Sequence, residues 1–327
     1  MNGYMSGYLP FRADDETQKR KRRSSQPNQS DDERSPQMNQ QFFKKMALIT
    51  GMVAGALVSG QALAGNFTAS YSAGLSTYSI QGTEPSDGAK HPVFIYTVGT
   101  TETWNNGQAT AAVAEMAAKG FVAAAVQYDS SLFGTCSQIL AKAQYIYQGS
   151  TASSAVAKLC ARTTADCSKG IVAAGFSQGS VIAIHGKNFD SRVRAAYGMG
   201  AHNLYSVYDL SSCMNNGKHT QPSSNIRIVN GETDTFPGGT ATTVRTSSQA
   251  VTGKTCAGAY ECLNANGSGW IMVKASQVGD LSADHCYQRA LGDCVGAESV
   301  LDNGWRNGTG SWGLKANLTW LAGFATP

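Results

Sequence analysis

Long apolar runs are scarce in this sequence of 327 residues. The run at residues 46–59 has 14 residues, whereas an α-helix needs ~20 to cross a bilayer. Residues 1–37 show almost no apolar periodicity and include a basic run at residues 19–23. We therefore expect no permanent membrane anchor, and we expect no buried core from residues 1–37.

The apolar run at residues 46–59 has the surroundings of an export signal. Lys44 and Lys45 precede it, and the small residues at 62–64 follow it. A basic start, an apolar centre and small residues before a cleavage site are typical of secretory signal peptides. We predict a signal peptide over residues 38–64, cleaved after its last residue, and hence a secreted or periplasmic protein.

The segment before this signal is unusually long. We interpret residues 1–37 as a disordered leader or as the result of a misassigned start, with translation beginning at Met38. The basic run at residues 19–23 has the composition of a nucleic-acid or nuclear-import patch. Its position upstream of an export signal argues against that alternative.

Excess charge is also missing from the predicted mature chain, residues 65–327. Its 263 residues are enough for one large α/β domain with a sizeable core. They contain 17 Lys and Arg against 16 Asp and Glu, because much of the basic surplus lies in the leader. The mature surface therefore gives no electrostatic reason to expect nucleic acid as a partner.

Metal-site spacing is absent, because the sequence contains no C-x-x-C and no H-x-x-x-H pair. Eight cysteines follow the predicted cleavage site, and an even number behind an export signal indicates disulfide bonds. Close spacing favours three short-range pairs and leaves one long-range pair. The expected pairs are Cys160 with Cys167, Cys256 with Cys262, Cys286 with Cys294, and Cys136 with Cys213. We expect no metal and no other cofactor.

Buried strands alternate with helices after residue 90, which predicts an α/β fold with a mostly parallel central sheet and helices on both faces. Residues 67–82 alternate apolar and polar residues around Gly74, as a β-hairpin at the sheet edge would. Asn105 or Asn106 is the expected cap of the first helix. The expected strands span residues 92–98, 121–126, 170–176, 193–200, 226–230 and 270–275. The expected helices span residues 107–119, 135–148, 151–161, 178–189, 240–250 and 310–324.

Only one insertion interrupts this alternation before Asp234. Residues 201–225 are rich in Tyr, Ser and Asn and contain Cys213. The insertion is too short for a large helical lid domain. We therefore expect loops, rather than a cap, above an open site.

Residues 175–179 read Gly-Phe-Ser-Gln-Gly and lie between an apolar run at 171–174 and a helix-compatible run at 180–185. In a sharp turn from strand to helix, small neighbours let the central residue adopt a strained backbone conformation that exposes its side chain. Ser177 is therefore the candidate nucleophile.

A serine hydroxyl needs a base to remove its proton and a carboxylate to orient that base. In proteins with this type of turn, the acid and then the histidine follow the serine in the sequence. Of the five histidines, His91 precedes the serine and His185 lies on the helix that follows it. His202 and His219 come before any strand that could supply the acid. His285 remains as the candidate base.

Two carboxylates follow the strand at residues 226–230, namely Glu232 and Asp234. We choose Asp234, because side chains just past a strand end turn toward a histidine above the sheet. Glu232 stays open as the alternative and is otherwise a structural carboxylate of the turn. Asp284 is next to His285 in the chain, which is a poor position for reaching its ring.

Backbone donors and apolar walls complete the predicted site. A tetrahedral intermediate needs two N–H donors, one from the residue after the nucleophile and one from the loop after the first parallel strand. Gln178 is the first donor, and the second is Thr100 or, as the alternative, Thr101. Trp104 and Phe236 are candidate apolar walls for the substrate.

The motif at residues 175–179 resembles that of the secreted serine esterases of the α/β-hydrolase superfamily, which include cutinase-like enzymes, polyester hydrolases and poly(hydroxyalkanoate) depolymerase-like proteins. The loop at residues 98–100 with the helix after it, and the late Asp234 and His285, add to the resemblance. It covers roughly residues 90–290. Many lipases have His-Gly where this sequence has Val-Gly at the start of the loop.

This resemblance implies an α/β-hydrolase fold with a triad of Ser177, His285 and Asp234 and with oxyanion donors at Gln178 and Thr100. We hypothesise a secreted, monomeric, metal-independent hydrolase of carboxylic esters that works through an acyl-enzyme. The expected open cleft favours bulky or polymeric esters. An acyltransferase or peptidase with the same triad, or a non-catalytic binding protein on a hydrolase scaffold, are the alternatives.

Overall fold

The computed structural model describes residues 64–291, 294 and 300–326, which all belong to one compact unit. The predicted leader, residues 1–37, lies outside the described residues. So does the predicted signal peptide, apart from Ala64, which is the first residue of strand β1.

Nine strands of the described chain form one sheet in the order β1-β2-β4-β3-β5-β6-β9-β11-β10. The six strands from β4 to β11 are parallel, whereas β1, β2 and β10 are antiparallel at the two edges. The predicted α/β fold with a mostly parallel central sheet is confirmed. The bounds are β1 Ala64–Ala73, β2 Ser76–Pro85, β3 Val93–Thr97, β4 Val122–Val126, β5 Ile171–Phe176, β6 Val193–Met199, β9 Ile226–Gly231, β10 Glu261–Leu263 and β11 Gly269–Val273.

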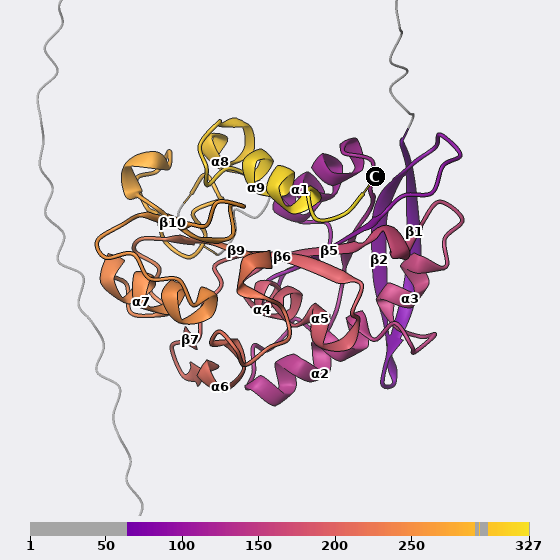
Figure 1. Cartoon of the computed structure of the whole chain (residues 1–327), viewed down its shortest axis with the longest axis horizontal. Helices are drawn as coiled ribbons and strands as arrows, with labels where there is room; N and C mark the ends of the chain where they lie inside the picture. Colours follow the sequence, from indigo (N-terminus) through magenta and orange to yellow (C-terminus); the bar gives the residue numbers. More distant parts are fainter. Residues whose placement is uncertain (1–63, 292–293, 295–299, 327) are drawn as a thin grey trace, which may run out of the picture. The chain divides into compact units, whose positions relative to one another are not determined.

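Helices cover the sheet in two layers. In Figure 1, helices α1, α8 and α9 lie on one side of the sheet, and α2, α4, α5 and α7 lie on the other. Their bounds are α1 Gly107–Ala118, α2 Cys136–Tyr147, α3 Ala155–Cys160, α4 Gln178–Ile184, α5 Gly186–Phe189, α6 Ser211–Met214, α7 Ala241–Thr252, α8 Asn303–Asn307 and α9 Leu314–Ala322. Because the central strands are parallel, their carboxyl ends lie at one edge of the sheet. Side chains from several loops can come close together at this edge.

Local signals account for most element boundaries. The predicted hairpin is present as β1 and β2, and Gly74 at its turn has a φ of +60°. Asn106 rather than Asn105 caps α1, since its side chain accepts a hydrogen bond from the N–H of Ala109 at 2.7 Å. The helix expected at 178–189 is instead α4 and α5, with Gly186, a poor helix former, after the break.

Two other expectations near the C-terminal end need correction. The helix expected over residues 310–324 is shorter, and a separate helix α8 precedes it. The capping side chain of Asp302 accepts a hydrogen bond from the N–H of Trp305 at 2.9 Å, which starts α8. Strand β10, three residues long, was not expected because so short an edge strand has no periodicity to detect.

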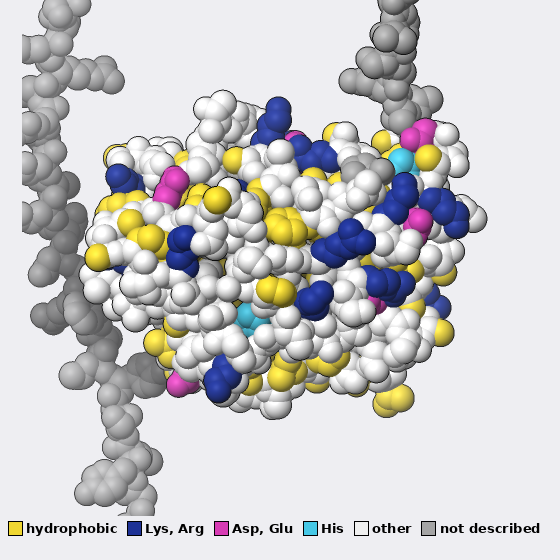
Figure 2. All heavy atoms as spheres, in the orientation of Figure 1, with side chains coloured by type: hydrophobic (Ala, Val, Ile, Leu, Met, Phe, Trp, Pro, Cys, Tyr) yellow, Lys and Arg dark blue, Asp and Glu magenta, His cyan; other side chains and the backbone are white. Residues whose placement is uncertain are grey.

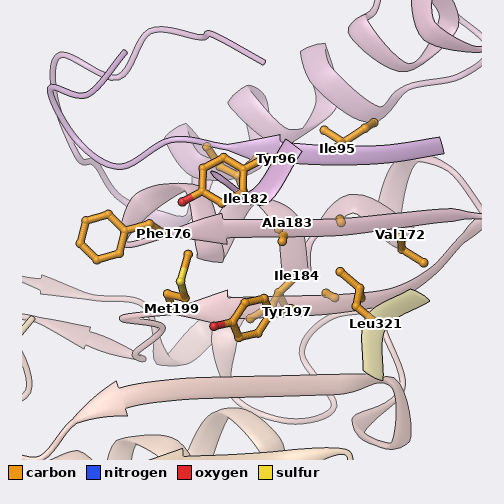
Figure 3. Packing of buried hydrophobic residues seen from close by; sticks show 14 of the residues in the cluster. Ile95, Tyr96, Val172, Phe176, Ile182, Ala183, Ile184, Tyr197, Met199 and Leu321 are labelled. Carbon is orange, nitrogen blue, oxygen red and sulfur yellow. The ribbon is translucent and has the colours of Figure 1, made fainter. Parts of the chain in front are cut away.

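The central strands form the middle of the hydrophobic core. Every residue of β3, β4 and β5 is buried, as the uninterrupted apolar runs predict. Figure 3 shows Phe176 and Met199 at the ends of two neighbouring strands, with Val172 toward the opposite end. Truncating a core side chain such as Ile182, which is fully buried, would cost about 2–5 kcal/mol of folding free energy. The core therefore provides a rigid base for groups at the strand ends.

All four predicted disulfide bonds are confirmed. They join Cys136 to Cys213, Cys160 to Cys167, Cys256 to Cys262, and Cys286 to Cys294, which leaves no free cysteine. The first bridge spans 77 residues and ties α2 to α6. The last spans eight residues just after His285. These two bridges brace segments beside the predicted site.

The insertion at residues 201–225 forms only short elements. It contains the two-stranded ribbon of β7 Leu204–Tyr205 and β8 Tyr208–Asp209, the helix α6 and a turn of 3-10 helix, Ser223–Asn225. Within the part of the chain that the structure describes, no lid domain covers the carboxyl edge of the sheet. This agrees with the expectation of loops rather than a cap.

The surface shows two further features. On the face drawn in Figure 2, Lys and Arg side chains lie as separate groups with uncharged atoms between them. Of the helices in residues 64–291 and 300–326, none has the length and apolar character needed to span a bilayer.

Candidate active site

Ser177 stands in a strained turn between β5 and α4, as predicted. Its backbone has φ 52° and ψ −122°, values that a non-glycine residue adopts only where its surroundings enforce them. A β-carbon at Gly175 would collide with the carbonyl of Gly179, and one at Gly179 would collide with the carbonyl of Thr97. The two glycines are therefore required for strand and helix to pack this closely around the serine.

Asp234 and His285 form a buried pair. Asp234 follows β9 and is fully buried, and its Oδ2 accepts a hydrogen bond from Nδ1 of His285 at 2.6 Å. Its other oxygen accepts from the N–H of Phe236 at 3.0 Å. A carboxylate bound in this way holds the imidazole in one orientation and leaves Nε2 as the nitrogen that can act on substrate.

Ser177 and His285 line the same cavity, of about 300 Å³. Nε2 of His285 is buried and has no hydrogen-bond partner among the described residues. The hydroxyl of Ser177 therefore donates no hydrogen bond to it in this structure. The ring lies against Gly200, whose φ is +59°; a β-carbon there would be 2.7 Å from Cε1 of the histidine. Hydrogen bonds of catalytic groups are often long in ligand-free structures and shorten when substrate binds.

A second histidine on the same carboxylate was missed by the sequence analysis. Nε2 of His202 lies 2.8 Å from Oδ2 of Asp234, and Nδ1 lies 3.2 Å from Oγ of Ser247. His202 is fully buried. It follows β6, which is the neighbour of β9 in the sheet, so adjacency of the two strand ends was the signal that could have revealed it.

The charge of Asp234 depends on these two rings. Burial on its own raises the pKa of the Asp234 carboxyl, but His285 and His202 lower it through their charge and their hydrogen bonds, and the net pKa is far below the usual range. Asp234 is therefore a carboxylate at neutral pH, and it can stabilise positive charge that develops on His285.

The other two carboxylates considered lie elsewhere. Glu232 accepts hydrogen bonds from the N–H of Ala275 at 2.5 Å and from the hydroxyl of Tyr260 at 2.8 Å. Asp284 accepts from the N–H of Cys286 at 2.7 Å. Neither contacts the ring of His285 through a hydrogen bond, so the geometry favours Asp234 over Glu232.

The two threonines proposed as oxyanion donors differ in their backbone contacts. The N–H of Thr101 donates to the carbonyl of Ser130 at 2.8 Å, which removes it as a donor to substrate. Among the described residues, the backbone N–H groups of Thr100 and Gln178 donate no hydrogen bond to the protein. The side chain of Gln178 also donates to Oγ1 of Thr100 at 3.2 Å. This favours Thr100 over Thr101.

A buried ion pair connects the loop after β3 to the segment that follows His285. Glu102 accepts a hydrogen bond from the N–H of Gly99 at 2.7 Å and forms an ion pair with Arg289. Arg289 donates in turn to the carbonyl of Cys294 at 2.6 Å, within the loop closed by the Cys286–Cys294 bridge. The sequence analysis did not identify either charged residue.

The two residues predicted as apolar walls, Phe236 and Trp104, line different cavities. Phe236 lines the cavity of Ser177, and its ring centre lies 4.4 Å from that of His285. Trp104 does not line this cavity but lines another one, beside Phe67 of the edge strand. Its N–H donates to Oε1 of Gln127 at 2.9 Å, which fixes the loop in this position.

Three of these residues also have the composition of a metal site. One ligand atom each of His202, Asp234 and His285 lies within 4.8 Å of the others. Both histidines, however, direct a nitrogen to Oδ2 of Asp234. Hydrogen bonding explains the cluster, and a metal there would have to displace these N–H protons.

No protein-family model matches the chain, and no curated protein does. Among solved structures, the apo form of Thermogutta terrifontis esterase 2 is 16% identical with a TM-score of 0.44, over 64% of this chain and 82% of that chain. Est1E from Butyrivibrio proteoclasticus is 12% identical with a TM-score of 0.43, over 68% and 91%. XC6422 from Xanthomonas campestris, described as an a/b serine hydrolase without lid, is 10% identical with a TM-score of 0.41, over 64% and 82%. Values this low give no ground for an activity, which has to be argued from the site.

Proposed function

We propose that this protein is a serine hydrolase that cleaves carboxylic esters through an acyl-enzyme. The observation that carries the proposal is the strained Ser177 sharing one cavity with His285, whose other nitrogen is bound to buried Asp234. Three such groups contributed by separate segments have the roles of nucleophile, base and orienting acid.

The reaction has two halves. In the first, Oγ of Ser177 attacks the ester carbonyl while Nε2 of His285 takes its proton, and the same nitrogen then protonates the departing alcohol. In the second, His285 removes a proton from water, which attacks the acyl-enzyme and releases the acid. Asp234 stays ionised throughout and stabilises the imidazolium.

Backbone groups stabilise the oxyanion in this proposal. The N–H groups of Gln178 and Thr100 supply the two donors, one from the start of α4 and one from the loop after β3. The short tie from Glu102 to the N–H of Gly99 holds this loop in place. Removing one such donor costs about 10²–10³ in kcat in serine hydrolases of known mechanism.

We infer secretion or a periplasmic location from the predicted signal peptide together with four disulfide bonds, which persist in oxidising compartments. A monomer is the proposed state, and the proposed mechanism needs no metal. Triad chemistry of this type also serves acyltransferases and peptidases, so the acceptor and the scissile bond are part of the test.

A fluorophosphonate probe tests the nucleophile directly. We expect stoichiometric labelling, with the mass of the adduct mapped to Ser177, and none in a Ser177→Ala variant of the same chain. Labelling at another residue, or none in the folded wild-type protein, contradicts the proposal. Product analysis with p-nitrophenyl butyrate in the presence of an added alcohol or amine then shows whether water is the preferred acceptor.

A further inference from the structure

A second cavity, of about 430 Å³, lies beside the one that contains Ser177. We call it the aromatic groove. Its walls come from the β1–β2 hairpin, the loop after β4, helix α2 and strand β8. Six aromatic rings are among its lining residues, those of Tyr71, Tyr78, Tyr128, Phe133, Tyr145 and Tyr208.

The aromatic groove adjoins the site at two side chains. Phe133 and Tyr208 line both cavities, and their ring centres lie 5.4 Å apart. Phe133 also packs against Tyr205, at 4.4 Å between ring centres, inside the cavity of Ser177. A ligand that enters the cavity beside Ser177 therefore meets the groove at these rings.

The two charged residues of the aromatic groove, Lys142 and Asp129, make hydrogen bonds within the protein. Nζ of Lys142 donates to the carbonyl of Leu132 at 2.7 Å and to Oε1 of Gln178 at 3.0 Å. Asp129 accepts from the side chain of Ser131 at 2.5 Å. Much of the apolar surface that the groove offers to a ligand comes from exposed side chains such as Tyr145 and Leu132, which are 46% and 74% exposed.

We propose that the aromatic groove binds an aromatic ring carried by the ester substrate at a distance from its scissile carbonyl. The inference rests on the proposed function, because the shared rings place the groove next to the reacting serine. Tyrosine and phenylalanine rings make favourable offset or edge-to-face contacts with another ring, which suits an aryl group. The substrate class is thus an aryl-bearing ester long enough to reach from one cavity to the other.

Matched substrates and variants test this assignment. Tyr145→Ala opens the groove wall, and Ala141→Phe fills the groove from the same helix; both positions are exposed. For p-nitrophenyl 5-phenylvalerate we expect KM to rise by about 2- to 10-fold in each variant, with p-nitrophenyl acetate unchanged. The control is Leu75→Ala, which removes a fully exposed apolar side chain at the hairpin tip that lines neither cavity.

The outcomes separate this inference from the proposed function. Fluorophosphonate labelling and acetate hydrolysis at the wild-type level show that the site and the fold of each variant are intact. Equal KM values for wild type and both variants with the phenylvalerate ester would overturn the aromatic groove as a substrate site while leaving the esterase proposal standing. An equal loss in Leu75→Ala would overturn it too, because general surface apolarity would then be the cause. If wild type is inactive on both esters and unlabelled, the proposed function fails instead.

Discussion

The proposed catalytic groups come from two kinds of structure that are fixed in different ways. Ser177 directly follows the buried strand β5, and Asp234 is the third residue after the buried strand β9, so the rigid core determines where they stand. His285, His202 and Thr100 stand in loops, where contacts between distant segments determine their position. The first half of the site is encoded locally, and the second depends on the assembled fold.

The contacts that hold the loop half are polar and buried. Glu102 and Arg289 pair across 187 residues of sequence, and Arg289 and Glu102 are both almost fully buried. Removing one partner of a buried pair leaves an uncompensated charge, which is more damaging than losing the contact itself. Replacing Ser177 should therefore abolish chemistry, whereas changes at residues that only support the loops should disturb positioning and stability.

The largest expected effect is in the strand half. Ser177→Ala removes the nucleophile without adding bulk, so the fold and its melting temperature should be retained. We expect kcat/KM for p-nitrophenyl acetate to fall by roughly 10⁴-fold or more, measured in the same buffer as wild type. Turnover within tenfold of wild type would show that the cavity does not act through this serine.

A smaller effect is expected in the loop half at His202. His202→Ala deletes one of the two hydrogen bonds that the side chains of histidines donate to Oδ2 of Asp234. From the free energy of a hydrogen bond to a charged group, we expect kcat to fall by about 10- to 100-fold. The residue touches no substrate in this proposal and acts by positioning Asp234. Labelling of Ser177 by the fluorophosphonate should persist but become slower.

His202→Gln is the matched control, because its side-chain N–H can reach the same carboxylate. We expect it to restore kcat to within about threefold of wild type, because the hydrogen bond to Asp234 is kept. If Ala and Gln at this position are equally impaired, the ring is needed for packing alone. If neither variant changes kcat, Asp234 holds His285 without the second histidine.

The same comparison explains what could be predicted from the sequence. The sheet, the turn at Ser177 and the choice of Asp234 followed from periodicity and from residues adjacent in the chain. The short-range disulfide pairs followed from spacing, and the long-range pair from elimination. These features are local, or they have few alternatives, so one sequence contains enough information.

What was missed depends on contacts between distant segments. His202 was set aside because it precedes the acid in the chain, a rule that applies to the catalytic base but not to a second partner of the carboxylate. Arg289 has no sequence signal, since its partner Glu102 lies on another loop. Trp104 was expected at the substrate, but a hydrogen bond of its backbone to Gln127 directs the loop elsewhere.

Two disulfide bonds of different span, one of which ties α2 to α6 beside the site, provide a third, graded prediction. The Cys136–Cys213 bridge closes 77 residues and the Cys160–Cys167 bridge closes seven. In the chain-entropy description, replacing both cysteines of the long bridge by Ser should cost about 4.5 kcal/mol of unfolding free energy, against about 2.4 kcal/mol for the short one. Urea denaturation of the two double variants measures both. Equal losses would mean that the long bridge constrains the unfolded chain no more than the short one.

The smallest expected effect concerns Asp284, next to His285 in the loop half. Burial raises the pKa of the Asp284 carboxyl to about 6, compared with about 3.9 in an unfolded chain. Between these values the folded protein keeps the proton longer, so the stability of the protein falls as pH rises from 4 to 6 and stays lower above that range. Asp284→Asn removes the cost of burying the charged carboxylate, so its melting temperature at pH 8 should exceed that of wild type. The expected difference is only about 1–3 °C, because water still screens a partly exposed carboxyl. At pH 4 the difference should vanish, and acetate hydrolysis at pH 8 should stay within about threefold of wild type. A large loss of hydrolysis in this variant would instead assign the orienting role to Asp284 and break the division between strand and loop halves.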